Sequence, residues 1–130
     1  NGYSMLGFPT ETEPEIRQTI DVVCHSSLHT TSFFTVTPFP NTDVYRRVLH
    51  ATPEKLSGIR YDDMEYATIH CNLSDVPDEI LFSCQRQAHR RFYLNPRRVF
   101  RILRDYPSPG SLPFILPVLV SRLTKGLLVP

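Results

Sequence analysis

The sequence of 130 residues predicts an α/β fold with parallel strands. Two apolar segments, residues 3–8 and 31–37, each precede a segment whose apolar residues recur at helical spacing. The order strand, helix, strand, helix implies parallel pairing through right-handed crossovers. Apolar residues make up 41% and charged residues 21%, which is typical of a globular protein rather than a disordered tail.

The first predicted unit covers residues 3–26. Its strand, residues 3–8, starts so abruptly that we expect the chain to begin inside an element. A capping box follows, with Thr12 as N-cap and Glu15 at the third helical position. We therefore expect a helix from this point to about residue 26.

The second predicted unit has the strand at residues 31–37, which is rich in threonine, phenylalanine and valine. Residues 38–40, Pro-Phe-Pro, close it with a rigid turn. Asn41 or Thr42 can cap the next helix, which two apolar i,i+4 pairs extend to about residue 50. Residues 51–73 are then expected to form a loop with a weak strand at 66–73.

Two further helices are predicted beyond this loop. Ser74 or Asp75 should cap the first, which begins near Pro77 and places four residues on one buried face: Leu81, Cys84, Ala88 and Phe92. Asn95 and Pro96 end it and begin the second, whose apolar residues run to about residue 106. We expect the remaining tail to be a proline-interrupted helix.

Charge, hydropathy and cysteine spacing exclude several classes. A net charge of +1 argues against nucleic-acid binding over the whole chain. The longest apolar run, residues 112–120, contains two prolines and is far shorter than the ~20 residues of a membrane span. Three cysteines match neither a disulfide framework nor a CxxC metal site, and no signal peptide is recognised. We expect reduced thiols in a cytoplasmic chain.

The two strand-to-helix junctions carry the strongest functional signal. They read GFPTET at residues 7–12 and TPFPNT at residues 37–42. Ligands collect outside the carboxyl ends of parallel strands, where loops converge and helix N-termini point free amide groups outward. The two junctions are therefore expected to lie side by side at a ligand-binding edge.

These junctions resemble the GxPxET and PFPGT turns in the second half of the radical S-adenosylmethionine barrel. Asn41 replaces the usual glycine, and asparagine tolerates a left-handed backbone better than most residues. A third segment, AHRRFYLNPR at residues 88–97, resembles the AYRRFYLRP segment of cobalamin-binding members. The chain thus resembles the C-terminal part of a radical S-adenosylmethionine enzyme of the cobalamin-binding type.

The resemblance implies the C-terminal part of a partial (β/α) TIM-like barrel over residues 1–73, followed by a helical extension over residues 74–130. In this family a CxxxCxxC loop ligates a 4Fe-4S cluster, whose unique iron binds S-adenosylmethionine and cleaves it to a 5′-deoxyadenosyl radical. Such a loop is absent from these 130 residues. The resemblance implies cobalamin as a further cofactor, and the substrate stays open.

By the same resemblance the first turn supports S-adenosylmethionine and the second lies near its adenine, with Glu11 as a polar or capping group. No catalytic or metal-ligating residue is assigned. The implied cofactor-binding residues are Gly7, Pro9, Glu11, Thr12, Pro38, Phe39 and Pro40. Helix capping alone also explains Glu11 and Thr12, and packing alone explains the turn at residues 38–40.

Two alternatives stay open: a methylthiotransferase-like enzyme of the same superfamily without cobalamin, and a non-catalytic module that docks an acidic partner. The second rests on a run of arginines without an acidic residue between them: Arg86, Arg90, Arg91, Arg97, Arg98, Arg101 and Arg104. This run fits a solvated face paired with distant acids, or a protein, lipid or nucleic-acid surface. The interleaved Phe92, Tyr93 and Phe100 are expected to face the core. His70 and Cys71 alone are too few for a metal site.

The open edge of the sheet is expected to pair with the rest of the barrel or with a second chain.

We predict that the isolated chain binds no iron-sulfur cluster, because its three cysteines fall on separate predicted elements and lack the CxxxCxxC spacing. Anaerobic reconstitution with iron and sulfide should leave the protein colourless. Stoichiometric 4Fe-4S absorbance after desalting would contradict this prediction.

Overall fold

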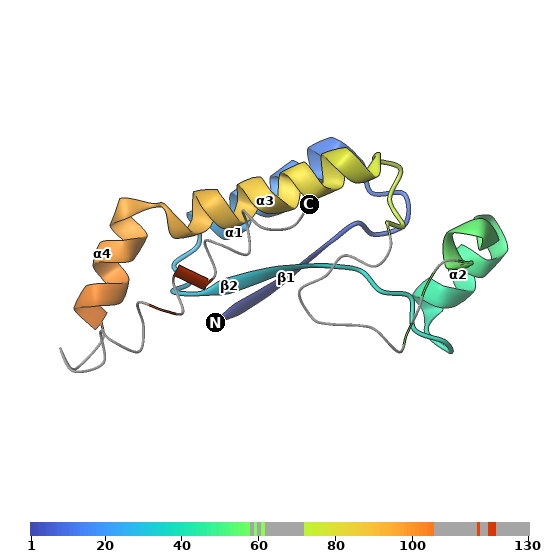
Figure 1. The fold of residues 1–130 in the computed structure, drawn as a ribbon, viewed down its shortest axis with the longest axis horizontal. Helices are drawn as coiled ribbons and strands as arrows, with labels where there is room; N and C mark the ends of the chain where they lie inside the picture. The colour runs from blue at the N-terminus through green and yellow to red at the C-terminus, as the bar shows by residue number, and fades with distance from the viewer. Residues whose placement is uncertain (58, 60, 62–71, 106–116, 118–119, 122–130) are drawn as a thin grey trace.

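The computed structural model describes residues 1–57, 59, 61, 72–105, 117, 120 and 121 (Figure 1). The elements are β1 (Gly2–Leu6), α1 (Glu13–His25), β2 (Thr31–Thr35), α2 (Asp43–Ala51), the 3-10 turn η1 (Pro53–Leu56), α3 (Asp78–Tyr93) and α4 (Pro96–Asp105). Strands and helices alternate through α2, which confirms the predicted α/β class. The predicted strand at residues 66–73, with His70 and Cys71, and most of the predicted helical tail lie outside the described residues.

The two strands pair in parallel, as predicted, in a register that runs from Gly2 opposite Thr31 to Leu6 opposite Thr35. Both are shorter than the sequence indicated. Gly7 adopts a positive φ of 80°, which turns the chain out of β1 directly after Leu6. One more hydrogen bond continues the pairing past β2, from the Val36 amide to the Leu6 carbonyl at 3.0 Å.

The first helix begins at the predicted capping box. The Glu15 carboxylate accepts hydrogen bonds from the backbone N–H of Thr12 at 2.8 Å and from its hydroxyl at 2.6 Å. Ile16 and Ile20 lie one turn apart on the inner face and are almost fully buried. The capping box thus fixes where α1 begins, and from that start Ile16 and Ile20 face the core.

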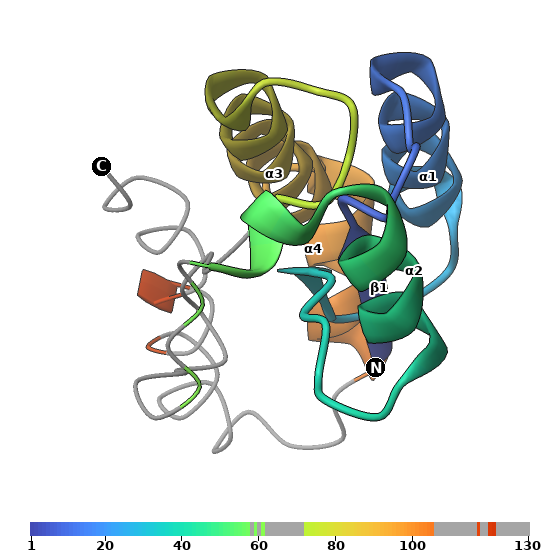
Figure 2. The ribbon, with the colours of Figure 1, turned by 90° about the vertical axis from the view of Figure 1, so that its right-hand side faces the viewer.

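Helices α1 and α3 lie side by side over one face of the two strands, and α2 lies beyond the strands' carboxyl ends (Figures 1 and 2). The four predicted face residues of α3 are all buried. The main core consists of Leu6, Ile16, Ile20, Phe33, Val76, Leu81, Cys84, Ala88, Phe92 and Tyr93. This core takes side chains from both sides of residue 73, while the boundary proposed there stays a prediction.

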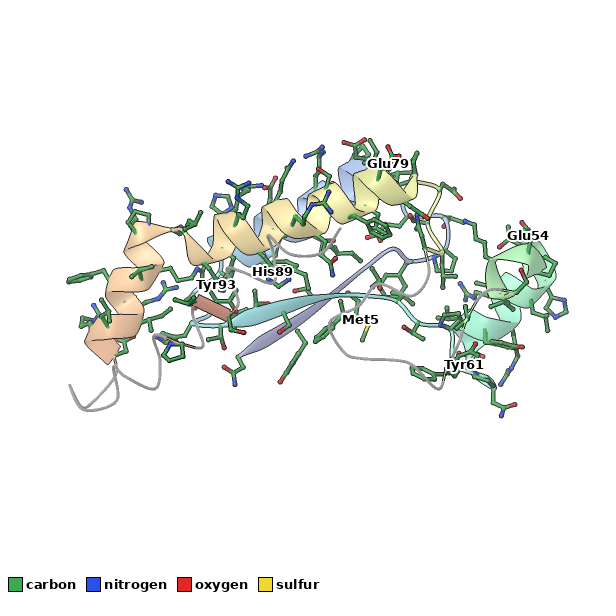
Figure 3. The ribbon with its side chains drawn as sticks, in the orientation of Figure 1. Met5, Glu54, Tyr61, Glu79, His89 and Tyr93 are labelled. Atoms are coloured by element: carbon green, nitrogen blue, oxygen red, sulfur yellow. The ribbon has the colours of Figure 1, made fainter. Side chains whose placement is uncertain are left out.

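The face of β1 opposite the helix layer is largely exposed. The side chains of Tyr3 and Met5 are 75% and 55% exposed, and the labelled Met5 projects from the face away from α3 (Figure 3). Strands of a parallel sheet are usually buried on both faces, whereas only one face of β1 is buried in the structure described here. Apolar residues alternate with small ones in β1, and only one of the two faces meets a helix layer.

The outer edge of β2 is covered by side chains of α3. Thr30 and Val36 bond to β1, so Thr31 and Phe33, which alternate with them, direct their backbone groups to the other edge. The Tyr93 hydroxyl accepts from the Thr31 N–H at 3.1 Å and donates to the Thr31 carbonyl at 2.5 Å. The Gln85 amide donates to the Phe33 carbonyl at 2.7 Å. Among the described residues, the edge of β1 is the one left without such cover.

A smaller core joins the second unit to the segment before α3. Val36, Val48 and Leu73 form it, next to η1. The Lys55 ammonium donates to the carbonyls of Leu73 at 3.3 Å and Ser74 at 2.8 Å. These contacts hold α2 and η1 at the carboxyl end of the strands.

Several details of α3 and α4 differ from the sequence prediction. The N-cap of α3 is Pro77 and makes no side-chain capping bond, so neither Ser74 nor Asp75 caps it. Asn95 caps α4 as expected, because its side-chain oxygen accepts from the Arg97 amide at 3.0 Å. Phe100 is 68% exposed rather than directed to the core. None of the helices in the described part of the chain combines the length and hydropathy of a membrane span.

We predict that Thr12→Ala lowers the free energy of unfolding by ~1 kcal/mol, the usual cost of losing an N-cap oxygen. The Thr12 hydroxyl and backbone hydrogen bonds lower the pKa of Glu15. A carboxyl whose pKa is lowered on folding stabilises the fold above its unfolded pKa, and this stabilisation is lost as the pH falls. Urea unfolding should therefore show the variant's deficit near neutral pH and a smaller one in acid. An unchanged midpoint at neutral pH would contradict the cap.

We also predict that the isolated chain associates through the edge of β1, because an uncovered parallel strand with exposed apolar side chains favours pairing with another copy. The N–H of Met5 points away from β2, so Met5→Pro should reduce association without breaking the β1–β2 ladder. Ser4→Pro, the matched control, should break that ladder and lower the melting temperature. Light scattering across a concentration series measures association, and thermal melting measures stability. A compact wild-type monomer with a cooperative thermal transition would contradict the prediction.

Candidate functional site

The two predicted junctions lie at the same edge of the sheet. They follow the carboxyl ends of β1 and β2, which are neighbours and run in parallel, and they lead into α1 and α2 (Figure 1). Pro38 is fully buried at this edge, whereas Phe8 and Phe39 are 41% and 52% exposed. The structure thus places all of the sequence-predicted residues on two adjacent turns.

The first turn depends on the backbone conformation of Gly7. Its φ of 80° lies in the region that disfavours a side chain, and Thr10 also has a positive φ, of 68°. A Cβ on Gly7 would lie 3.2 Å from Cδ2 of Leu81, which belongs to the core face of α3. Packing against the helix layer therefore explains the glycine without any ligand.

Glu11 folds back over this turn. One of its carboxylate oxygens accepts hydrogen bonds from the backbone N–H groups of Gly7 at 2.5 Å and Phe8 at 3.0 Å. Two free donors at the end of a strand would be an anion site, but here the chain's own carboxylate occupies them. Glu11 is thus a local capping group, and the turn can offer a ligand its shape rather than these donors.

The second turn is held by Asn41 and Thr42. Asn41 has φ of 70°, which confirms that asparagine serves the left-handed position where the motif has glycine. The Thr42 hydroxyl accepts from the Tyr45 amide at 3.2 Å and donates to the Phe39 carbonyl at 2.7 Å. The N-cap of α2 and the turn are therefore one hydrogen-bonded unit.

Tyr61 packs against the second turn, which the sequence pattern did not indicate. Its hydroxyl donates to the Pro38 carbonyl at 2.7 Å, and its ring centroid lies 6.0 Å from that of Phe39. The two rings are tilted by 39°. This pair adds an aromatic surface at the same edge, and its separation of about two dozen residues explains why a local motif could not reveal it.

A third segment, residues 72–77, meets the first turn. Its Asp75 amide donates to the Glu11 carbonyl at 3.2 Å. Asn72 organises it, accepting from the Ser74 amide at 3.0 Å and donating to the Val76 carbonyl at 2.6 Å. The candidate site is thus built from the two turns, Tyr61 and residues 72–77, of which the sequence indicated only the two turns.

The chemistry of this edge favours aromatic and apolar groups over charged ones. Away from this edge, on the uncovered face of the strands, the rings of Tyr3 and Phe34 stack with centroids 6.0 Å apart. Phe39 and Tyr61 add rings at the second turn. An exposed aromatic surface beside rigid turns suits a flat heterocycle such as adenine. The residues present therefore fit the adenine part of S-adenosylmethionine better than an anionic group.

The described cysteines are poorly placed for metal or redox chemistry. Cys84 is in the main core and Cys24 is half-buried on α1. Burial raises the pKa of both thiols, which disfavours the thiolate that binds metal. Within the described residues no group of three or more His, Cys, Asp or Glu side chains is arranged to hold a metal ion.

The arginine run divides into inward and outward members. Arg98 is 2% exposed, and its guanidinium donates to the carbonyls of Leu28, Cys24 (2.7 Å) and Ser26 (3.2 Å). The same group lies 3.6 Å above the centre of the Phe92 ring. Arg98 therefore binds the C-terminal end of α1, which complements the helix dipole.

Other members of the run make simpler contacts. Arg101 also donates to the Leu28 carbonyl, at 3.3 Å. Arg91 pairs with Asp21 at 2.7 Å, and Arg104 with Asp105 at 2.8 Å. Part of the run is thus structural, as the solvated-face interpretation proposed, although its most buried member binds carbonyls rather than an acid.

A scan of the chain against protein-family models, and searches of curated proteins and of solved structures, found no match. The likeness to radical S-adenosylmethionine enzymes consequently rests on the three motifs and on the arrangement of the turns. It is taken further below as a proposal.

We predict that Arg98→Met lowers the free energy of unfolding by about 3 kcal/mol, because it removes the guanidinium donor of the partly buried Cys24 and Ser26 carbonyls and one of the two donors of the Leu28 carbonyl. Arg97→Met is the matched control on the neighbouring, exposed position of α4, and should change stability by less than ~0.5 kcal/mol. Urea unfolding measures both. Equal effects of the two substitutions would show that the carbonyl contacts do not stabilise the fold.

Proposed function

We propose that this chain forms the last two βα units and the helical extension of a radical S-adenosylmethionine enzyme of the cobalamin-binding type. The observation that carries the proposal is the direction in which the sheet can grow. Tyr93 and Gln85 occupy the outer edge of β2, while the edge of β1 is uncovered within the described structure. Further parallel strands would therefore join beside β1, which is where the earlier strands of a partial barrel belong.

The placement of the turns supports the same proposal. Both motif turns lie at the carboxyl edge of the strands, where α/β proteins bind ligands, and the helices α1 and α3 cover only the opposite face from Tyr3 and Met5. That uncovered face corresponds to the interior of a barrel. The rigid first turn would support the ligand by shape, and Phe39 with Tyr61 would offer rings to its adenine.

The third motif has a physical role that agrees with this architecture. Within residues 88–97, Ala88 and Phe92 are buried in the main core, and Tyr93 binds the edge of β2. Asn95 caps α4. The segment thus attaches the helical extension to the final strand, and the cobalamin-binding type is inferred from its resemblance alone.

The residues described hold no ligands for the cluster, so its loop would belong to the barrel part that precedes β1. When bound to such a 4Fe-4S cluster, S-adenosylmethionine supplies a 5′-deoxyadenosyl radical for chemistry on a substrate that stays open. The residues of this chain would bind and orient the cofactor and exclude water, without a catalytic side chain of their own.

The coding sequence upstream of Asn1 tests the proposal first. We expect it to encode a CxxxCxxC loop after an early strand, and a cobalamin-binding domain in front of the barrel. A complete reading frame without the cysteine loop would contradict the proposal. A loop without the cobalamin domain would assign the protein to the methylthiotransferase-like alternative or to another relative without cobalamin.

The full-length protein tests the role of the second turn. After anaerobic reconstitution and reduction it should release 5′-deoxyadenosine from S-adenosylmethionine. Phe39→Ala should raise the KM for S-adenosylmethionine by about tenfold, since base–aromatic stacking contributes ~1–3 kcal/mol. Phe100→Ala, which removes an exposed ring on α4, is the control and should leave KM unchanged. Equal KM values in both variants would remove the adenine role of Phe39.

A further inference from the structure

The solvent-exposed face of α4 carries both apolar and basic side chains. Ile102 and Arg98 point inward and are buried. Phe100 and Leu103 are 68% and 47% exposed, and at helical spacing they share the outer face with Arg97 and Arg104. The helix lies at the end of the molecule away from α2 (Figure 1). An exposed apolar strip therefore runs beside an exposed basic strip.

The end of α3 extends this surface. Leu94, which is 58% exposed, lines a shallow depression together with Arg90, Arg97 and His25. Asp21 and Asp105 pair with other arginines, and no acidic side chain among the described residues pairs with Arg90 or Arg97. The charge of these two arginines is thus available to an anionic partner. We call Leu94, Phe100 and Leu103 with Arg90 and Arg97 the corner surface.

We propose that the corner surface docks on an anionic lipid bilayer, with the apolar side chains entering the interface and the arginines binding lipid phosphates. A short helix face that combines exposed Phe and Leu with Arg fits this environment, because arginine extends its charge to the headgroups while its stem lies on apolar surface. The sequence that follows continues the same chemistry. Residues 106–130 contain no acidic residue and are largely apolar, with Arg122 and Lys125 among them.

Other anionic partners fit this surface less well. Single-stranded nucleic acid is bound through several aromatic rings along a basic groove, whereas Phe100 is the single aromatic residue of the corner surface, next to two leucines. An acidic protein surface would match the arginines but would place acids against these leucines. The bilayer is the partner that satisfies both strips. This inference does not depend on the proposed enzymatic function.

Vesicle flotation with the full chain tests the proposal. The protein should float with vesicles of phosphatidylcholine and phosphatidylglycerol at low salt, far less with phosphatidylcholine alone, and less at high salt. Arg90→Gln with Arg97→Gln should weaken partitioning about 25-fold, since each arginine near an anionic surface contributes a factor of about five. Phe100→Ser should weaken it several-fold.

Matched variants separate the corner surface from general charge and stickiness. Arg46→Gln with Arg47→Gln removes two exposed arginines of α2, and Met5→Ser changes the uncovered strand face. Both should partition as the wild type does. All variants are compared by thermal melting, because the substituted positions are exposed and should leave the fold intact.

Several results would overturn the proposal. These are failure of the folded chain to float with anionic vesicles, equal flotation with neutral ones, or equal losses in the corner and control variants. An oligonucleotide or polyglutamate that binds the corner surface while vesicles do not would assign the surface to nucleic acid or to an acidic protein instead.

Discussion

At the outer edge of β2, side chains of α3 form the backbone hydrogen bonds that a third strand would otherwise form. The arrangement of the described structure depends on these bonds. Tyr93 completes both backbone groups of Thr31 with one hydroxyl, and Gln85 completes the Phe33 carbonyl. Both residues lie on α3, whose apolar face also meets α1. The helix therefore holds the two βα units together while it ends the sheet on one side.

The same helix layer gives the two faces of the strands different chemistry. The covered face is continuous with the core, and the other presents Tyr3, Met5 and part of Phe34. At the carboxyl edge, the Glu11 carboxylate accepts hydrogen bonds from the amide donors of the first turn. Recognition at this edge would thus rely on shape and aromatic contact, and a negatively charged ligand would meet a carboxylate where related geometries provide free amides.

Local rules in the sequence predicted much of this fold. The capping box of Thr12 and Glu15, the left-handed Asn41 and the buried stripe of α3 each follow from interactions within a few residues, and the structure bears them out. The site was predicted only in part. Tyr61, Asp75 and Lys55 make contacts between distant segments, which no local pattern encodes.

The sequence was least informative about which partner each side chain has. Burial of both faces of β1 follows from apolar composition only when a second layer is present, so the composition does not reveal the exposure of Tyr3 and Met5. Phe100 was assigned to the core because aromatic residues are usually buried, although the inward positions of α4 belong to Ile102 and Arg98. An arginine in a basic run gives no sign that it will bind carbonyls instead of acids.

The contacts of Arg98 also determine where the chain can be shortened. The carbonyls of Cys24, Ser26 and Leu28 lie at the end of the first helix and just beyond it, yet their donor is about seventy residues later in the chain. A fragment that stops before α4 would keep every residue of both βα units and still lose the closure of α1. Proteolysis within the α3–α4 corner should therefore loosen the N-terminal helix, so the smallest stable fragment must extend through α4.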